Sequence, residues 1–458
     1  MTPVTDIPAH IEAVKNGRAA ARNSDLRARL KLLETFEKSL LEHQEGFVRA
    51  LAQDFAKPRF EALMSELFPV KEEIKIIRAE LADWMRDQRV TGSPFFPGGK
   101  SYIRHEGKGT ILVIAPWNYP VALALVPLVG ALAAGNTVLL KPSELTPATS
   151  KMLAEFCAKT FPPHLVRVVE GGVPQTEALL KHEFDHIFFT GSTAVGKIIM
   201  RAAAEHLTPV TLELGGKSPA IVAPDADLRH AAERLLWGKS LNAGQTCVAP
   251  DYVCVPEAKL AEFKNLLEQA RAQMQPRLDE QPQIVTERHA KRLKDMRAEL
   301  PDVANVEEAD PRRVTLAFPA NPPADSKVMQ EEIFGPLLPL VSYRDLDEVF
   351  TRIAQGPRPL ALYVFAKSRR TQELILSKTN SGGVCVNDTL LHLGNHHLPF
   401  GGTGSSGMGN YHGVASLRAF THERAVFKQG PLKMLPRLLS PPYTEGRNRL
   451  IEKILRWM

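Results

Sequence analysis

The sequence predicts an α/β protein in which a doubly wound parallel sheet is followed by a second α/β domain and accompanied by a small β arm. From residue 110 to about residue 214, short apolar segments alternate with amphipathic helical patterns, which is typical of parallel strands joined by crossover helices. A second region of the same kind follows. The chain has 458 residues, more than one hydrophobic core usually supports, so two or more domains are expected.

The first ninety residues are expected to form helices. Ser24 can cap a helix whose leucines and phenylalanine recur at helical spacing. A further helix is expected over residues 67–84, where apolar residues again recur every three or four positions. We interpret both apolar stripes as core faces rather than as ligand sites.

Residues 90–108 change in composition toward glycine, proline and serine, with short alternating segments such as KSYIRHEG. This pattern favours a β-hairpin that leaves the first domain. An arm of this kind often pairs with a partner subunit, so the hairpin is a candidate oligomerisation element.

Residues 109–140 contain no charged side chain and are long enough to cross a bilayer. Prolines, glycines and asparagines interrupt the stretch and divide it into strand, turn, helix and strand. Continuous apolar strands are typical of a parallel sheet that is buried on both faces. We therefore interpret the stretch as a buried βαβ unit.

Two strand ends in this region carry groups that could bind a ligand, because ligands of doubly wound sheets bind beyond the carboxyl ends of the strands. At one end, Lys141 and Glu144 could hold ribose hydroxyls, although each by itself would usually be a solvated surface charge. At the other, a strand turns through Gly191 and Ser192 into a helix whose N–H groups could face a pyrophosphate. The segment lacks the GxGxxG fingerprint, so a plain strand-to-helix turn remains an alternative.

Composition and spacing limit the other ligand classes. The net charge is +6 and the pI is near 9.0, but Lys and Arg are scattered along the chain, so nucleic-acid binding is not expected. The four cysteines show no paired spacing and the first thirty residues lack an apolar signal-peptide core, which favours a reduced, cytoplasmic protein. His392, His396 and His397 have no Cys or acidic partner at ligand spacing, so we interpret them as loop histidines and expect no metal site.

One cysteine has the setting of a nucleophile. Residues 241–250, LNAGQTCVAP, place Cys247 after a Gly-Gln-Thr turn with small neighbours that leave room for a substrate. A thiol becomes a good nucleophile when N–H groups or a positive charge stabilise its thiolate and the site can be reached. The alternative is a buried cysteine that serves only as a small apolar side chain.

Seven motifs resemble those of a known family. PWNYP, LLKPSE, FTGSTAVGK, LELGGKSP, GQTCVAPDYV, MQEEIFGP and LPFGGTGSSGMGNYHG occur in the order found in aldehyde dehydrogenases. The resemblance covers roughly residues 11–427. The GQTCVAPDYV segment, the YHG ending and the short N-terminus resemble the class 3 branch, which includes bacterial enzymes similar to coniferyl aldehyde dehydrogenase. Residues 281–284 and 314–319 depart from the family pattern, away from these motifs.

The resemblance implies NAD(P)-dependent oxidation of an aromatic or a medium- to long-chain aliphatic aldehyde to the carboxylic acid. Cys247 would attack the carbonyl and form a thiohemiacetal, while Asn118 would donate its amide to the developing oxyanion. After hydride loss, Glu213 would activate the water that hydrolyses the thioester. For each residue taken alone, a turn-forming role for Asn118 and a surface carboxylate for Glu213 are the alternatives.

The resemblance also implies a set of cofactor-binding residues. They are Trp117, Lys141, Glu144, Gly191, Ser192, Leu214, Glu332 and Phe334. Glu332 and Phe334 would position the nicotinamide ribose, and Gly191 and Ser192 would lie near the phosphates. NAD is expected to be preferred, because Glu144 would repel a 2′-phosphate, with NADP also accepted.

The implied division of the chain has three parts and a tail. Residues 1–89 and 109–212 would form the NAD(P)-binding domain, and residues 213–400 the catalytic domain. Residues 90–108 and 401–430 would form the bridging segments of a homodimer, and residues 431–458 the tail.

Two other functions compete with aldehyde oxidation to the acid. Acyl transfer to coenzyme A is disfavoured because Glu213 supplies a base that hydrolysis needs and a thiol acceptor does not. An inactive homologue with a binding or structural role would be expected to lack Cys247, Asn118 or Glu213, and all three are present.

The tail has a basic amphipathic pattern. Residues 444–458 place Leu450, Ile451, Ile454, Leu455 and Met458 on one helical face, with arginines and a lysine nearby. Packing on protein is the ordinary explanation of such a face. Weak contact with an anionic membrane surface is the alternative, since the segment is too short to span a bilayer.

Overall fold

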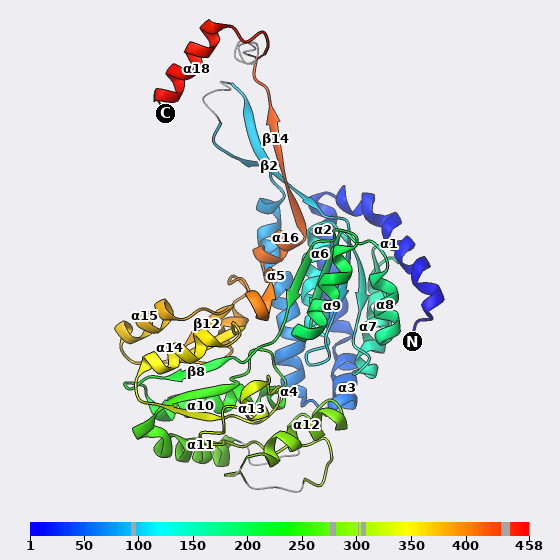
Figure 1. Ribbon diagram of the computed structural model, residues 1–458. Helices are drawn as coiled ribbons and strands as arrows, with labels where there is room; N and C mark the ends of the chain where they lie inside the picture. Colours follow the sequence, from blue (N-terminus) through cyan, green and yellow to red (C-terminus); the bar gives the residue numbers. More distant parts are fainter. Residues whose placement is uncertain (93–97, 275–280, 301, 304–307, 432–439, 458) are drawn as a thin grey trace.

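The structure is a computed structural model that describes residues 1–92, 98–274, 281–300, 302–303, 308–431 and 440–457. Two parallel sheets, each covered by helices, lie one above the other, and a narrow antiparallel arm extends from the upper one (Figure 1). The predicted α/β class with a doubly wound parallel sheet is confirmed. No described helix is long and apolar enough to cross a membrane.

The first sheet has six strands in the order β13-β7-β6-β3-β4-β5. Five of its strands, β7, β6, β3, β4 and β5, are parallel, and only the edge strand β13 pairs antiparallel, with β7. The strands are β3 (Thr110–Ile114), β4 (Thr137–Lys141), β5 (Val166–Val168), β6 (His186–Thr190), β7 (Val210–Glu213) and β13 (Gly407–Met408). The first five lie where the apolar segments of the sequence predict them.

Helices cover both faces of this sheet, because successive side chains of its strands point to opposite sides. Ile111 and Val113 pack into a core with α2, α3, α5, α6 and α7, whereas Leu112 and Ile114 pack into another with α1, α8 and α9. The helices are α1 (Ile7–Arg22), α2 (Leu26–Glu42), α3 (Gln44–Phe55), α5 (Phe68–Trp84), α6 (Ala122–Ala133), α7 (Pro147–Thr160), α8 (Val173–Leu180) and α9 (Thr193–Ala204).

The expected cap of α2 needs a correction. Asp25, not Ser24, is the N-cap, and its side chain accepts a hydrogen bond of 2.8 Å from Ala28 N. The hydroxyl of Ser24 donates instead to Ala21 O at 2.6 Å. Only Ser24 and Asp25 lie between Asn23, the C-cap of α1, and the first residue of α2. Ser24 therefore bonds to the end of α1, and Asp25 caps the start of α2.

The second sheet has five parallel strands in the order β10-β9-β8-β11-β12. They are β8 (Pro219–Val222), β9 (Tyr252–Pro256), β10 (Leu340–Tyr343), β11 (Ala361–Phe365) and β12 (Gly383–Val386). One core contains α10 (Leu228–Ser240) and α11 (Leu260–Met274), and the core of the other face contains α14 (Leu346–Gln355) and α15 (Arg369–Lys378). Two further helices are α12 (Glu287–Ala298) and α13 (Lys327–Gln330).

The arm is a three-stranded antiparallel sheet in the order β1-β2-β14. Its strands are β1 (Gln88–Arg89), β2 (Lys100–Gly107) and β14 (Thr421–Lys428), preceded by α16 (Val414–Ala419). The predicted hairpin over residues 90–108 is thus the pairing of β1 with β2, although residues 93–97 lie outside the described part. In Figure 1 the arm extends well beyond the body of the molecule.

The C-terminal helix α18 (Glu445–Trp457) lies beyond the far end of the arm (Figure 1). Leu450, Ile451 and Leu455 of its predicted apolar face are exposed. Met458, which the sequence places on the same face, lies outside the described residues. The helical pattern of the tail is therefore observed, whereas its partner remains a prediction.

Candidate active site

Cys247 follows a short 3₁₀ turn (Leu241–Gly244) that joins α10 to the loop before β9. Three successive residues of this turn have positive φ: Asn242 at 53°, Ala243 at 52° and Gly244 at 74°. A side chain at Gly244 would also meet the carbonyl of Gly335. Glycine is therefore required at this position, because its φ is positive and a side chain would collide with Gly335. This agrees with the small residues that the sequence places around Cys247.

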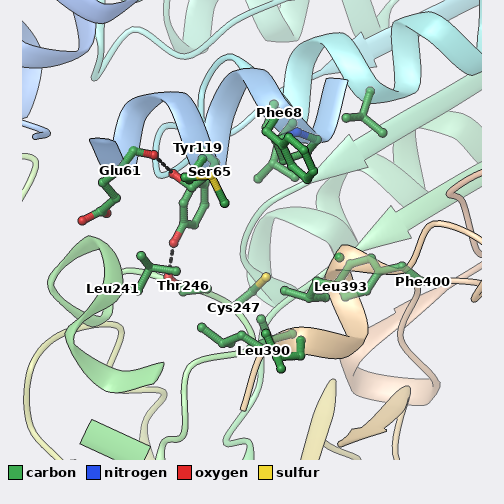
Figure 2. Close-up of a pocket in the computed structure, with 18 of the residues that line it drawn as sticks. Glu61, Ser65, Phe68, Tyr119, Leu241, Thr246, Cys247, Leu390, Leu393 and Phe400 are labelled. Atoms are coloured by element: carbon green, nitrogen blue, oxygen red, sulfur yellow. Dashed lines mark hydrogen bonds between the residues drawn. The ribbon is translucent and has the colours of Figure 1, made fainter. Parts of the chain in front are cut away.

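Asn118 lies across from the cysteine loop and is tied to it by hydrogen bonds. It is buried, and its Nδ2 donates to Gln245 O at 3.0 Å. In return, Asn242 Nδ2 donates to Asn118 O at 2.8 Å. Tyr119, the next residue, bonds through its hydroxyl to Thr246 Oγ1 at 2.7 Å (Figure 2). Two turns 127 residues apart are thus fixed to each other immediately beside Cys247.

A buried ion pair supports the Asn118 turn from behind. Lys57 Nζ lies 2.6 Å from Glu66 Oε1, both side chains are 0% exposed, and Lys57 also donates to Asn118 O at 3.3 Å. The other oxygen of Glu66 accepts from Val121 N and Ala122 N, each at 3.0 Å, at the start of α6. Glu66 lies in a π-helical turn (Leu63–Leu67), a feature often found at functional sites. The pair could not be predicted from the sequence, because nothing in the local pattern shows that these two charges are buried together.

Glu213 ends β7 and is 2% exposed. Neither of its carboxyl oxygens has a hydrogen-bond partner in the part of the chain that the structure describes. Burial raises the pKa of this carboxyl well above its usual range, so the neutral acid is favoured in this state. Its charge would in turn raise the pKa of Cys247 and that of Tyr411.

The thiol of Cys247 is not a thiolate in this state. Burial raises its pKa to about 12, and the nearby carboxyls of Glu332 and Glu213 raise it further, against the backbone N–H groups of Cys247 and Val248. Glu332 is partly buried, removal of its carboxyl from water raises its pKa to about 8, and its Oε1 lacks a partner among the described residues. Two carboxyl groups able to exchange a proton therefore lie near the thiol.

The residues predicted to bind the nicotinamide end of a cofactor come together beside this thiol. The rings of Trp117 and Phe334 meet edge to face with centroids 5.2 Å apart, and Phe334 has a φ of 49°. Leu214 is buried against Gly196 of α9. Glu332 lies directly against the backbone of Gly215, and the segment is held because Asp251 Oδ1 accepts from Ile333 N at 2.9 Å.

The residues predicted to bind the adenosine and phosphate end lie at the carboxyl ends of β4 and β6. Lys141 and Glu144 form an ion pair of 3.0 Å, in which Lys141 is nearly buried and Glu144 is half exposed. Ser192 caps α9 by accepting from Val195 N, and Gly191 N donates to Glu213 O at 2.9 Å. Thr190 Oγ1, beside them, is buried without a partner among the described residues. A helix N-terminus beside an unpartnered hydroxyl fits the phosphates of a dinucleotide at this edge.

An apolar cavity of about 590 Å³ leads to Cys247. Figure 2 shows the thiol between Tyr119 and Thr246 on one side and Leu393 and Phe400 on the other. Most of the wall is apolar, with contributions from Phe60, Met64, Phe68, Trp237, Leu390 and Leu393. The size and the lining are those of a pocket for a small organic molecule.

The histidines that the sequence analysis interpreted as loop residues differ strongly in burial. His397 is exposed, whereas His396 is buried and lines the cavity, as does His412. Among the described residues, no group of three or more His, Cys, Asp or Glu could hold a metal ion. The burial of His396 depends on a carboxylate from α5, which the local sequence does not reveal.

Comparison with known proteins gives consistent matches along the chain. Residues 2–426 match the model of the family described as "Aldehyde dehydrogenase family". The chain is 42% identical to the "Probable coniferyl aldehyde dehydrogenase" of Pseudomonas aeruginosa, over 94% of this chain and 92% of that protein. It is 40% identical to the canine "Aldehyde dehydrogenase, dimeric NADP-preferring", over 90% and 93%. The solved structure of substrate-bound Staphylococcus aureus AldH is similar, with a TM-score of 0.94 and 37% identity over 99% of this chain and 100% of that one.

Proposed function

The chain belongs to the aldehyde dehydrogenase family and oxidises aldehydes with NAD or NADP, and we propose that Cys247 is its nucleophile, Asn118 its oxyanion donor and Glu213 its general base. One observation carries this proposal. The thiol lines an apolar cavity that also has Tyr119 and Thr246 in its wall, the Asn118 amide is bonded to the cysteine loop, and the buried carboxyl of Glu213 has no partner among the described residues.

The first step forms a bond between Cys247 Sγ and the aldehyde carbon. The carbonyl electron pair moves onto oxygen, where the amide of Asn118 and the N–H of Cys247 donate hydrogen bonds to the developing charge. Because the pKa of the thiol is raised to about 12, its proton must pass to a base as the bond forms, and Glu332 or Glu213 in its ionised form would accept it. When bound, the nicotinamide supplies the acceptor for the hydride that leaves the substrate carbon.

The second step is hydrolysis of the thioester that remains on Cys247. Glu213 takes a proton from a water molecule, the water oxygen bonds to the acyl carbon, and the carbon–sulfur bond breaks to release the acid and restore the thiol. A carboxyl without hydrogen-bond partners is free to turn toward that water. Its presence favours hydrolysis over acyl transfer to coenzyme A, because a thiol acceptor is itself a good nucleophile.

We infer that eight residues hold the dinucleotide. Trp117, Leu214, Glu332 and Phe334 would bind the nicotinamide side, and Lys141, Glu144, Gly191 and Ser192 the adenosine and phosphate side. NAD is proposed as the preferred cofactor, because Glu144 is half exposed at the place proposed for the ribose and would repel a 2′-phosphate. The positive charge of Lys141 would partly offset this repulsion, so slower use of NADP is expected.

The proposed substrates are aromatic and medium- to long-chain aliphatic aldehydes. The cavity is large and apolar, which favours such molecules over short or charged aldehydes. The name of the Pseudomonas aeruginosa relative, which refers to an aromatic aldehyde, supports the same class.

We propose that two chains form a homodimer through the arm. Residues 90–108 and 401–430 would be the bridging segments, residues 1–89 and 109–212 the NAD(P)-binding domain, and residues 213–400 the catalytic domain. Support comes from β14, an eight-residue strand at the edge of its sheet whose Phe427 is exposed. Such an edge usually needs a partner. Sedimentation of the purified protein at twice the chain mass is the expected result, and a monomer at micromolar concentration would contradict it.

A cytoplasmic location is proposed, and the tail of residues 431–458 has two candidate surfaces. Its exposed leucines and isoleucine would pack on the partner subunit or touch an anionic membrane weakly, with its basic residues facing the headgroups. Equal sedimentation with anionic vesicles by the full chain and by a chain that ends at Pro442 would exclude the membrane.

The experiment that tests the proposed function is an initial-rate screen of aromatic and aliphatic aldehydes with NAD and with NADP, run beside Cys247→Ala. The parent should reduce NAD with the larger apolar aldehydes. Cys247→Ala should still bind NAD, because the methyl group leaves the dinucleotide contacts alone, yet show no turnover. Turnover by Cys247→Ala would remove this residue from the mechanism.

A further inference from the structure

One wall of the substrate cavity contains a polar cluster that the proposed mechanism does not use. At its base is Glu73 of α5, which is 0% exposed. Its carboxylate accepts hydrogen bonds from His396 Nδ1 at 2.7 Å, Gly413 N at 2.9 Å and Ser416 Oγ at 2.6 Å. Residues more than 320 positions apart in the chain are joined here. Glu73 thus holds the ring of His396 with its other nitrogen, Nε2, turned away from the carboxylate.

A second imidazole lies flat on the first. The rings of His396 and His412 are 4.2 Å apart and within 4° of parallel, and both residues line the cavity. His412 has a φ of 79°, and its backbone N–H donates to Ser416 Oγ at 2.9 Å, so the Glu73 cluster also supports this unusual conformation. Within the described chain, neither ring nitrogen of His412 has a hydrogen-bond partner.

The two histidines lie on the Phe400 side of the thiol. The ring of His412 stacks on that of Phe400 at 5.3 Å, and Figure 2 shows Phe400 separated from Cys247 by Leu393. Tyr411 lines the same cavity as Cys247, and its ring meets that of His412 with centroids 4.4 Å apart. A substrate whose carbonyl reaches Cys247 can therefore extend toward the imidazoles.

The chemistry of His396 and His412 favours one kind of substrate group, a hydroxyl. Burial and the neighbouring His396 hold the pKa of His412 well below its usual range, so this ring is neutral and has one N–H donor and one acceptor. The carboxylate of Glu73 behind His396 disfavours a second anion. A hydroxyl group both donates and accepts, which matches the donor and the acceptor of the neutral His412 ring beside Nε2 of His396, whereas a methyl group would leave these nitrogens unpaired.

We propose that His396 and His412 are specificity residues that select aldehydes carrying a hydroxyl group, phenolic or alcoholic, at the end remote from the carbonyl. This inference rests on the proposed function, because it assigns part of the same cavity. His396 and His412 would contact the remote end of the substrate, and Glu73 is a positioning residue that orients His396.

The test compares substrates that differ only in the remote group. The pairs are 4-hydroxybenzaldehyde against 4-methylbenzaldehyde, and straight-chain aldehydes ending in CH₂OH against those ending in CH₃ over a range of lengths. For each protein, kcat/KM is measured with NAD and the hydroxyl-to-methyl ratio is taken. Dividing the variant's ratio by the parent's removes the intrinsic reactivity of each aldehyde.

His412→Phe keeps a flat ring in the stack but removes both nitrogens, and His396→Gln keeps an N–H that can donate to Glu73. Each variant should lower the hydroxyl-to-methyl ratio about tenfold for the best pair, the loss of one or two hydrogen bonds, while kcat/KM for the methyl substrate changes less than about twofold. His397→Gln is the matched control, since His397 is adjacent but exposed, and its ratio should equal the parent's.

An unchanged ratio in a folded, active His412→Phe and His396→Gln would overturn the proposal, as would an equal loss of kcat/KM for both members of a pair. If the parent oxidised no aldehyde at all, the proposed function would fail instead. The two failures are therefore distinguishable in one set of rate measurements.

Discussion

Two neighbouring regions around Cys247 differ in whether their ionisable side chains have hydrogen-bond partners. Beside the thiol, both oxygens of the buried Glu213 and Oε1 of the partly buried Glu332 have no partner among the described residues. At Asn118, by contrast, Lys57 and Glu66 are fully buried but bonded to each other and to backbone groups. An unpartnered buried polar group is costly, whereas a bonded one restrains its surroundings. The first arrangement is suited to proton transfer and the second to holding a donor in position.

The largest effect is expected when the unpartnered side is broken. Glu213→Gln should leave attack and hydride transfer possible but remove the base for deacylation. NADH should then appear in a burst of at most one equivalent per subunit, followed by a steady rate roughly 10² to 10⁴ below the parent's. Rapid-mixing absorbance measures the burst, and mass spectrometry of the quenched protein should find the acyl group on Cys247. Steady turnover at the parental rate without an adduct would refute this role.

A smaller but still large effect is expected at the border between the two regions. Asn118→Ala removes the amide proposed to stabilise the oxyanion, so the first hydride transfer should slow about 10²- to 10³-fold. Alkylation of Cys247 by iodoacetamide forms no oxyanion and should change less than about threefold. Tyr119→Phe, which loses only the bond to Thr246, is the control for movement of the turn. If alkylation and hydride transfer slow equally, Asn118 acts on the thiol and not on the oxyanion.

Breaking the bonded side should affect stability more than chemistry. Lys57→Met leaves Glu66 buried without its counter-ion, which should lower the free energy of unfolding by about 3–5 kcal/mol and kcat roughly tenfold. Lys57→Met combined with Glu66→Gln should regain much of the stability, as urea unfolding would measure. It should not regain the rate, because Asn118 O then lacks the hydrogen bond from Lys57. Full recovery of both would assign the pair a structural role alone.

The smallest expected effect is on the pH dependence of stability. Burial raises the pKa of Glu332 to about 8, so between about pH 4.5 and 8 the unfolded chain loses a proton that the folded chain keeps. Stability from this group is therefore present at low pH and lost as pH rises. Glu332→Gln cannot ionise, so its stability relative to the parent should increase from pH 5 to pH 8 and then level off, by a few kcal/mol at most. Urea unfolding at three pH values measures this, and a constant difference would contradict the expected burial of the charge.

Much of the sheet architecture was predictable because it depends on short-range patterns. The apolar segments that became β3, β4 and β6 are fully buried strands, and alternation of strand and helix is enough to indicate a parallel sheet. The N-cap of α2 was predicted at Ser24 and lies at Asp25. Both residue types are good N-caps, and the choice between them depends on where α1 ends. The candidate residues around Cys247 could also be identified from short-range patterns, because each motif is a continuous segment of the chain.

The sequence by itself therefore determined most strands and helices and supplied the candidate reactive side chains. Only the tertiary structure decided which charges are buried together and what shape the cavity has. Lys57 reaches Asn118 and Glu73 reaches His396 across 61 and 323 residues, and no local pattern encodes such distances. The physical reason is that helix and strand periodicity reflect burial of one face of a segment, whereas a buried ion pair or a stacked histidine requires two segments to approach at a given angle.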